Sequence, residues 1–461
     1  MSLTYFPSAD PGTVAIGGAD ADGKAKSGDT LTASVTGLPE GAVAAYQWFR
    51  DGQRIDKATD ASYAIGDNDN GCTLTCQVSD SAGFFDGAVW GQDVEVIAEK
   101  QAFAVYSDDD KSLDFYKRDK VPAVGDTFEG KTVTAVYTGA EDTSAAAEGR
   151  KAPWSAQASI ITNVTFVDSL HPTSTAYWFA MMGNLATIDL SGLDTSKIAD
   201  MTGMFGYCLS LTTLDLSNFD TSKVEDMTFM FIGCHSLASI DVSSFDTSKV
   251  TSMLKMFADC SDLASIDVSS FDTANVTHMD GMFWRCSSIR SLDVSNFDTS
   301  KVTGMREMFY RCSSLTTLDP SSFDTSKVTD MRGVFSHCSS LTTLDLSNFD
   351  TSKVASMDKI FSTMPKFQTL VVGNEWNWVG SECFPPEPNG NHITGADGKW
   401  YAKSDGTGYA PSEIPSRKAD TYYASKALLE SAGKAQASIA GDMMPAMLAG
   451  RTPSLAMELG M

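Results

Sequence analysis

The sequence predicts a mixed fold, in which an all-β sandwich precedes an α/β solenoid of short parallel strands plus helical turns. Aspartates in the middle of the chain recur every 26 residues, for example at positions 220, 246 and 272. Each repeat joins alternating leucines to apolar residues spaced three and four apart. The N-terminal part holds short alternating runs separated by Gly, Asn and Asp. A fixed period of this length indicates stacked units that bury a shared core.

Composition limits the classes of partner. The 461 residues carry a formal net charge of −25, whereas binding to nucleic acid needs a basic face. No apolar run is long enough to span a bilayer, so we expect no nucleic-acid partner and no transmembrane segment. The start, MSLTYFPSADPGTVAIGG, lacks the basic and apolar regions of a signal peptide. We also expect no sorting motif or anchor within this sequence.

The N-terminal runs predict the sandwich. GDTLTASVTG, YQWFRDGQRI and CTLTCQV alternate in polarity and are bounded by turn residues, which is typical of short antiparallel strands. We expect Trp48 in the core and Cys76 on a late strand. If Cys72 and Cys76 share one strand, they lie about 13 Å apart. That separation is too long for a disulfide bridge.

Each repeat predicts a short strand. In LTTLDLS (211–217), Leu214 and Leu216 should point inward, while Thr213, Asp215 and Ser217 point outward, because side chains alternate along a strand.

A helical turn is expected to follow the strand. Val224, Met227, Phe231 and Cys234 recur at spacings of three and four, which corresponds to one helical face. The Asp-Thr-Ser triplet that starts at Asp220 could cap the helix start.

The repeat cysteines form a column. A linear column does not make a tetrahedral zinc site, and buried cysteine is a common core residue. We therefore expect buried structural thiols, with disulfides or a metal as the alternatives. The column comprises Cys208, Cys234, Cys260, Cys286, Cys312 and Cys338.

The repeat motif, LDLSNFDTSKVxxMxxMFxxCSSL, resembles the BspA-like leucine-rich-repeat family of bacterial surface proteins, over roughly residues 155–373. The flanks at 104–139 and 394–423 resemble segments that border such arrays, and the N-terminal part resembles bacterial immunoglobulin-like modules. The resemblance implies an exported, surface-displayed protein with adhesion or host interaction as its role. It supplies no catalytic residues.

We predict six segments. They are an N-terminal leader or linker (1–12), an immunoglobulin-like β-sandwich (13–98), an N-terminal cap of the solenoid (101–180), a leucine-rich-repeat solenoid (181–373), a C-terminal cap or loop region (374–415), and a short helix with a disordered tail (416–461).

A column of aspartates is expected on the outward strand face. Like charges roughly 5 Å apart repel by about 0.8 kcal/mol in water, so something should offset this repulsion. Neighbouring Ser and Thr hydroxyls or Lys residues could do so, and bound calcium, which takes several oxygen ligands, is the alternative. We otherwise expect no cofactor. The column comprises Asp189, Asp215, Asp241, Asp267, Asp293, Asp319 and Asp345.

A candidate binding patch lies among the variable repeat positions. Trp284 and Tyr310 occupy the same column in adjacent repeats, and arginines cluster around them. Trp, Tyr and Arg dominate binding hot spots, and arginine pairs well with carboxylate or sulfate. The alternative is that these positions drifted and that the arginines supply countercharge. The predicted patch comprises Trp284, Arg285, Arg290, Arg306, Tyr310, Arg311 and Arg332.

Catalysis is not expected. The histidines within the repeats occupy different repeat positions, and no nucleophile motif or phosphate-binding loop is present. We predict a non-enzymatic interaction protein, outside the cell or on the bacterial cell surface, that adheres to a host extracellular protein or glycan. The alternatives are a structural spacer without a ligand and a carbohydrate-binding module. The histidines are His171, His235, His278, His337 and His392.

Overall fold

The computed structural model describes residues 12–84, 87–98, 100–141 and 151–435. Nearly all of the predicted leader (1–12) and most of the predicted tail (436–461) lie outside these ranges. Within them, no helix combines the length and apolar character needed to cross a membrane.

The chain divides into two compact units. The first comprises Met1–Phe103 with Tyr116–Ala123, and the second comprises Ala104–Phe115 with Val124–Met461.

The first unit contains two sheets. One has the order β1 (Thr13–Gly17), β3 (Thr30–Thr36), β6 (Ser62–Ala64). The other has the order β2 (Lys24–Ala25), β9 (Val94–Val96), β7 (Thr73–Asp80), β4 (Ala44–Arg50), β5 (Gln53–Arg54), with β8 (Ala88–Trp90) also paired to β7. A 3₁₀ turn, η1 (Asp67–Asp69), precedes β7.

Alternating side chains of both sheets form one core. Trp48 is fully buried, as predicted, and its Nε1 donates to the Asp60 carbonyl at 3.0 Å. Trp48 lies opposite Cys76 in the β4–β7 register. Cys72 and Cys76 are both free thiols. The core is therefore held by burial around the tryptophan and not by a disulfide.

After these two sheets, the chain forms a five-stranded sheet of order β14 (Ala135–Thr138), β10 (Gln101–Ser107), β11 (Ser112–Arg118), β15 (Asn163–Phe166), β16 (Thr187–Asp189). A hairpin of β12 (Thr127–Phe128) and β13 (Lys131–Thr132) and the 3₁₀ turn η2 (Ser155–Gln157) accompany it. Buried aromatic rings fill this end, with Phe115 stacked on Trp178 at 5.5 Å and edge-on to Trp154 at 5.0 Å.

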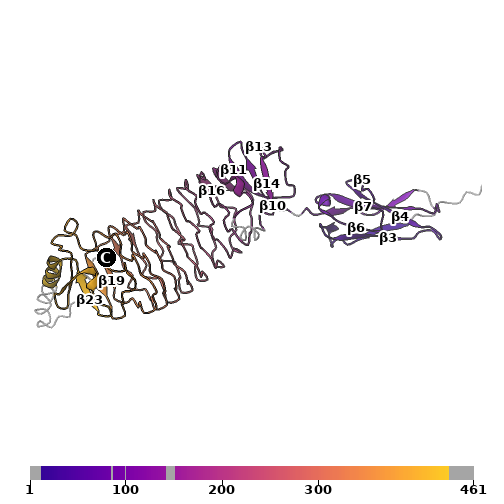
Figure 1. The fold of residues 1–461 in the computed structure, drawn as a ribbon. Helices are drawn as coiled ribbons and strands as arrows, with labels where there is room; N and C mark the ends of the chain where they lie inside the picture. Colours follow the sequence, from indigo (N-terminus) through magenta and orange to yellow (C-terminus); the bar gives the residue numbers. More distant parts are fainter. Residues whose placement is uncertain (1–11, 85–86, 99, 142–150, 436–461) are drawn as a thin grey trace, which may run out of the picture. The chain divides into compact units, whose positions relative to one another are not determined.

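The repeats lie side by side in register, as Figure 1 shows. Single parallel bridges link residues 26 apart in sequence, for example Ser252 with His278 and His278 with Gly304. Each repeat forms one coil of the chain. Short parallel strands appear in the later coils as β17 (Ser291–Leu292), β18 (Thr317–Leu318), β19 (Thr343–Leu346) and β20 (Thr369–Val372). We call residues 174–372 the repeat stack. Leu214 and Leu216 are buried and Thr213, Asp215 and Ser217 are exposed, as predicted.

The predicted α/β leucine-rich-repeat solenoid with helical turns is wrong, because the structure is nearly all β and the described repeats contain no helix. Where a helix was expected, each coil makes two tight turns with left-handed residues, such as Lys255 (φ 52°) and Asp259 (φ 60°). The Met253 amide donates to His278 of the next coil at 3.0 Å. These amides therefore bond between coils and not along a helix.

Aromatic rings run through the middle of the stack. Successive ladder phenylalanines have ring centroids 5.5 to 6.1 Å apart. Such offset stacking buries a large apolar area with favourable ring geometry. The ladder comprises Phe179, Phe205, Phe231, Phe257, Phe283, Phe309, Phe335 and Phe361.

The column of cysteines is buried and unpaired, as predicted. Each thiol donates to the carbonyl of a ladder phenylalanine one coil earlier, as Cys286 Sγ does to Phe257 at 3.0 Å. Burial raises the pKa of Cys234 and of Cys338 to about 12. The cysteines therefore satisfy a buried backbone acceptor while remaining neutral.

The threonine of each Asp-Thr-Ser triplet has a different role from the predicted helix cap. Thr299 is fully buried, and its Oγ1 donates to the Asp324 carbonyl of the next coil at 2.9 Å. The Thr221–Asp246 pair repeats this bond at 3.0 Å. The hydroxyl thus links neighbouring coils.

The last coil pairs with a C-terminal sheet of order β19, β20, β23 (Asp420–Tyr423), β21 (Trp400–Ala402), β22 (Gly408–Tyr409). The 3₁₀ turn η3 (Pro411–Glu413) precedes β23. The segment 416–461 was predicted as a short helix and tail. Its described part contains strand β23 and then a helix at residues 426–435. The ring centroid of buried Trp376 lies 6.2 Å from that of Phe361, so Trp376 packs against the last ring of the phenylalanine ladder.

Candidate functional site

Three columns of variable residues lie at the left-handed turns, one residue of each column in every repeat. We call the three columns together the turn face. They are the residue after each ladder phenylalanine, the residue before each ladder cysteine or its equivalent, and the third residue of each Met-x-x-Met segment or its equivalent. The columns are 180, 206, 232, 258, 284, 310, 336 and 362; 181, 207, 233, 259, 285, 311, 337 and 363; and 177, 203, 229, 255, 281, 307, 333 and 359.

Trp284 and Tyr310 meet on the turn face. Their ring centroids are 6.0 Å apart with an interplanar angle of 11°. Cations cover both rings, since Arg285 Cζ lies 5.0 Å and Lys255 Nζ 5.7 Å from the Trp284 centroid, and Arg311 Cζ lies 5.5 Å from that of Tyr310. Such contacts hold guanidinium groups in place without neutralising them.

Arg285 and Arg311 line one groove of about 360 Å³. Arg285 Nε lies 3.3 Å from Asp259 Oδ1, and His235 Nε2 lies 3.1 Å from the other oxygen of that carboxylate. Within the described part of the chain, no carboxylate forms an ion pair with Arg311. Its positive charge is therefore available to a ligand.

His337 extends this group by one coil. Its ring meets that of Tyr310 edge-on at 5.3 Å, and it lines the same groove as the two arginines. Burial and then the charge of Arg311 lower the pKa of His337. Neutral imidazole is favoured at this position, so the groove's fixed charge comes from the arginines.

Arg306 and Arg332 line a second groove of about 570 Å³, which Tyr310 and His337 also line. Arg306 Nη2 pairs with Glu307 at 3.1 Å. Arg332 forms a bidentate pair with Asp330. Burial alone would raise the pKa of Asp330, but the Arg332 hydrogen bonds outweigh it and hold that pKa below its usual value. Both arginines therefore already have carboxylate partners.

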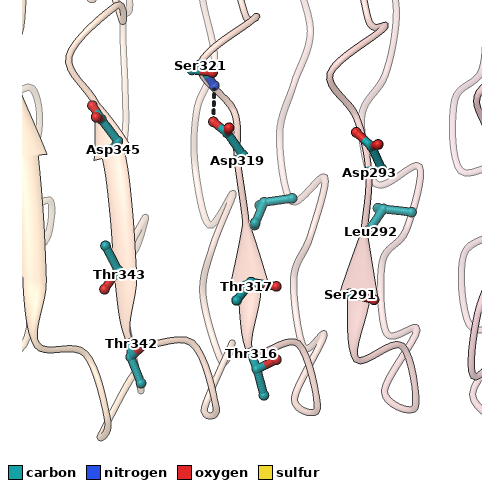
Figure 2. Close-up of a pocket in the computed structure, with 11 residues that line it drawn as sticks. Ser291, Leu292, Asp293, Thr316, Thr317, Asp319, Ser321, Thr342, Thr343 and Asp345 are labelled. Carbon is teal, nitrogen blue, oxygen red and sulfur yellow. Dashed lines mark hydrogen bonds between the residues drawn. The ribbon is translucent and has the colours of Figure 1, made fainter. Parts of the chain in front are cut away.

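Arg290 does not join the patch. It precedes β17, and its carbonyl accepts from Thr316 of the next coil at 3.0 Å. The next residue is Ser291 of β17, which lies with Thr317 of β18 on the strand face that carries the aspartate column (Figure 2). The structure thus brings six of the seven predicted residues to the turn-face region and separates Arg290 from them.

The aspartates of the strand face are bonded by their own backbone. In Figure 2, the Ser321 amide donates to Asp319 Oδ1, at 3.0 Å. The same bond, from the Ser295 amide, holds Asp293 at 3.0 Å. The Ser295 hydroxyl and then this amide lower the pKa of the Asp293 carboxyl. The serines two residues on therefore bond these carboxylates, as predicted for the neighbouring hydroxyls. Among the described residues, no ion pair joins one of the predicted lysines to this column.

In the ranges that the structure describes, no three His, Cys, Asp or Glu side chains gather as metal ligands would. His171 Nδ1 lies 3.6 Å from Glu141 Oε1, and His171 Nε2 lies 3.3 Å from Asp194 Oδ2. This group is separate in sequence from the His235–Asp259 pair.

Three contributors to the site were missed from the sequence. His337 and the serine column after the cysteines line the arginine groove, and Lys255 lies over the Trp284 ring. His337 lies one period after Arg311, so the alignment that paired Trp284 with Tyr310 could have found it. Lys255 lies three positions from the tryptophan column within its own coil, and only the left-handed turns bring it near Trp284.

A comparison with protein-family models places this region among proteins of undetermined role. The model described as "Mycoplasma protein of unknown function, DUF285" matches residues 173–292 and 286–381. No curated protein matches the chain. The matched ranges contain the arginine groove of Arg285 and Arg311 and all but one residue of the second groove. The repeat stack is therefore similar to this family.

Proposed function

We propose that the chain is a non-enzymatic interaction protein of the bacterial cell surface that binds a host extracellular protein through its turn face. One observation carries the proposal. In a chain of net charge −25, Trp284, Tyr310 and the unpaired guanidinium of Arg311 gather on adjacent coils beside a groove. Aromatic and arginine side chains that are held in place by packing are the usual anchors of protein interfaces.

The ring contacts favour a protein partner over a sugar. A sugar stacks on an open aromatic face, but Trp284 and Tyr310 face each other and their other contacts are with Arg285, Lys255, Arg311 and His337. The rings therefore act here as supports for cations. The carbohydrate-binding alternative would need these side chains to move.

The test is binding of the purified protein to a panel of host matrix proteins and glycans at physiological salt. A variant with alanine at Trp284, Arg285, Tyr310 and Arg311 is compared with Arg290→Ala, which removes one positive charge away from the grooves. We expect the panel to yield a protein ligand that the fourfold variant loses while its melting temperature shows that it is folded. Retained binding by that variant would remove the site, and no ligand at all would favour the spacer alternative.

A further inference from the structure

The turn face continues beyond the arginine groove into an apolar hollow. Tyr177, Met181, Tyr207, Phe229 and Ile232 line a hollow of about 400 Å³ in the first coils of the repeat stack. Met181 is 62% exposed and Tyr207 is 39% exposed. These residues occupy the same three columns that later carry Trp284, Arg285 and Lys255.

Glycines shape this hollow. A Cβ on Gly203 would come within 2.6 Å of the Tyr177 ring, and one on Gly233 within 2.6 Å of the Tyr207 ring. Both glycines are left-handed, with φ of 59° and 71°. The tyrosine rings can therefore lie against the turns of the next coil, and Tyr207 remains 39% exposed there.

Lys255 joins the hollow to the arginine groove. It lines the hollow, and its Nζ lies 5.7 Å from the Trp284 centroid. The neighbouring Arg285 and Arg311 then line the groove. Along the stack, the turn face thus changes from apolar to cationic without leaving its columns.

The serines of the arginine groove and the apolar hollow together favour a peptide over a sulfated chain. Ser287 Oγ donates to the Ser261 carbonyl at 3.2 Å, and Ser313 and Ser339 repeat this bond at 3.4 and 3.3 Å. Their protons are thereby engaged, so their oxygens offer acceptors to a ligand. A peptide presents N–H donors for these oxygens, carboxylates for the arginines and apolar side chains for the hollow, whereas a sulfated chain has no apolar side chains to fill the hollow.

We infer that the turn face is one composite docking surface for a single extended segment of a partner protein, in which apolar residues fill the hollow and acidic residues meet Arg285 and Arg311. Charge complementarity and the shared columns carry this inference. It rests on the proposed function, because it specifies the chemistry of the partner at the same face.

The test begins with a random 12-residue peptide library displayed on phage and selected on the immobilised full chain. We expect enriched peptides to combine a cluster of Asp or Glu with a cluster of apolar residues. Enrichment without acidic residues, or no enrichment, would overturn the inference. So would binding of a heparin oligosaccharide that is lost in Arg285→Ala/Arg311→Ala while no peptide binds, because that result assigns the groove to a sulfated glycan.

Variants then divide the surface. For a selected peptide measured by calorimetry, Met181→Ser/Ile232→Ser should weaken binding about tenfold, which corresponds to one lost apolar anchor. The same variant should bind the truncated acidic half of the peptide normally. Arg285→Ala/Arg311→Ala should weaken both peptides at least about tenfold, and Arg290→Ala should weaken neither. Equal effects of the three variants would contradict a composite surface.

The two proposals fail separately. If acidic–apolar peptides bind but no host matrix protein does, the docking surface stands and the host partner is wrong. If a matrix protein binds and Arg285→Ala/Arg311→Ala leaves its affinity unchanged, the docking surface is wrong while an interaction function stands.

Discussion

Two variants, Arg311→Gly and Arg311→Ala, test the turn geometry. The test is which of the two has the larger free energy of unfolding. Arg311 has a φ of 60°, a conformation that costs a residue with a Cβ roughly 1–2 kcal/mol and glycine almost nothing. At a helical position, glycine is instead about 1 kcal/mol less favourable than alanine. The two backbones therefore predict opposite signs.

The expected difference is modest. Both variants lose the guanidinium contact with Tyr310, so that loss cancels between them. Glycine also gains more conformational freedom on unfolding, which offsets part of its advantage. We expect Arg311→Gly to exceed Arg311→Ala by about 1 kcal/mol in free energy of unfolding.

Equilibrium urea denaturation followed by tryptophan fluorescence measures this difference, with the slopes compared to check that the transitions match. Arg332 provides the control, because it is not among the left-handed residues and its glycine variant should be the less stable one. If Arg311→Gly is no more stable than Arg311→Ala, the left-handed turn is wrong.

The repeat positions give three further predictions. Thr299→Val should lower the free energy of unfolding by about 1–3 kcal/mol, because the Asp324 carbonyl loses its buried donor. The control Thr303→Val, at an exposed position, should change the free energy of unfolding little when measured by the same urea titration. A thiol reagent at pH 8 should label half-buried Cys72 before denaturation and the ladder cysteines only after it, because complete burial keeps the reagent from their thiols and raises the pKa of those thiols. Fewer than nine reactive thiols in denaturant would reveal a disulfide. Hydrogen bonds, mainly from the serines two residues on, hold the pKa of many repeat aspartates below 3.8. The stability that these carboxylates contribute should therefore be present above pH 3.8 and be lost as the pH falls through their folded pKa. A melting temperature unchanged from pH 6 to pH 2.5 would contradict this.

The period and the inward residues could be predicted because burial repeats with the sequence. The alternation at Leu214 and Leu216 and the column that includes Cys234 needed only spacing. The turns could not be predicted in this way, since apolar residues three and four apart also arise when two four-residue turns follow each other. Glycine at 203, 281 and 333, in the column of Lys255, was the available signal of a left-handed backbone.

The patch was predictable only where residues share a column. Trp284, Tyr310 and their neighbouring arginines follow from the period. Arg290 was placed with them because it is close in sequence, but the chain has already passed Cys286 and left the turn face when it reaches Arg290, directly before β17. The apolar hollow was missed because Tyr177 and Met181 lie before the first full repeat, where the motif is degenerate.

The most direct test of the binding account is the affinity of Arg285→Gly/Arg311→Gly for the matrix protein that the panel identifies. Glycine suits both left-handed positions, so this variant should unfold no more easily than the parent chain. We expect its affinity to fall at least about tenfold while Arg290→Ala binds normally. Unchanged affinity in the double glycine variant would show that the turn face does not hold the partner.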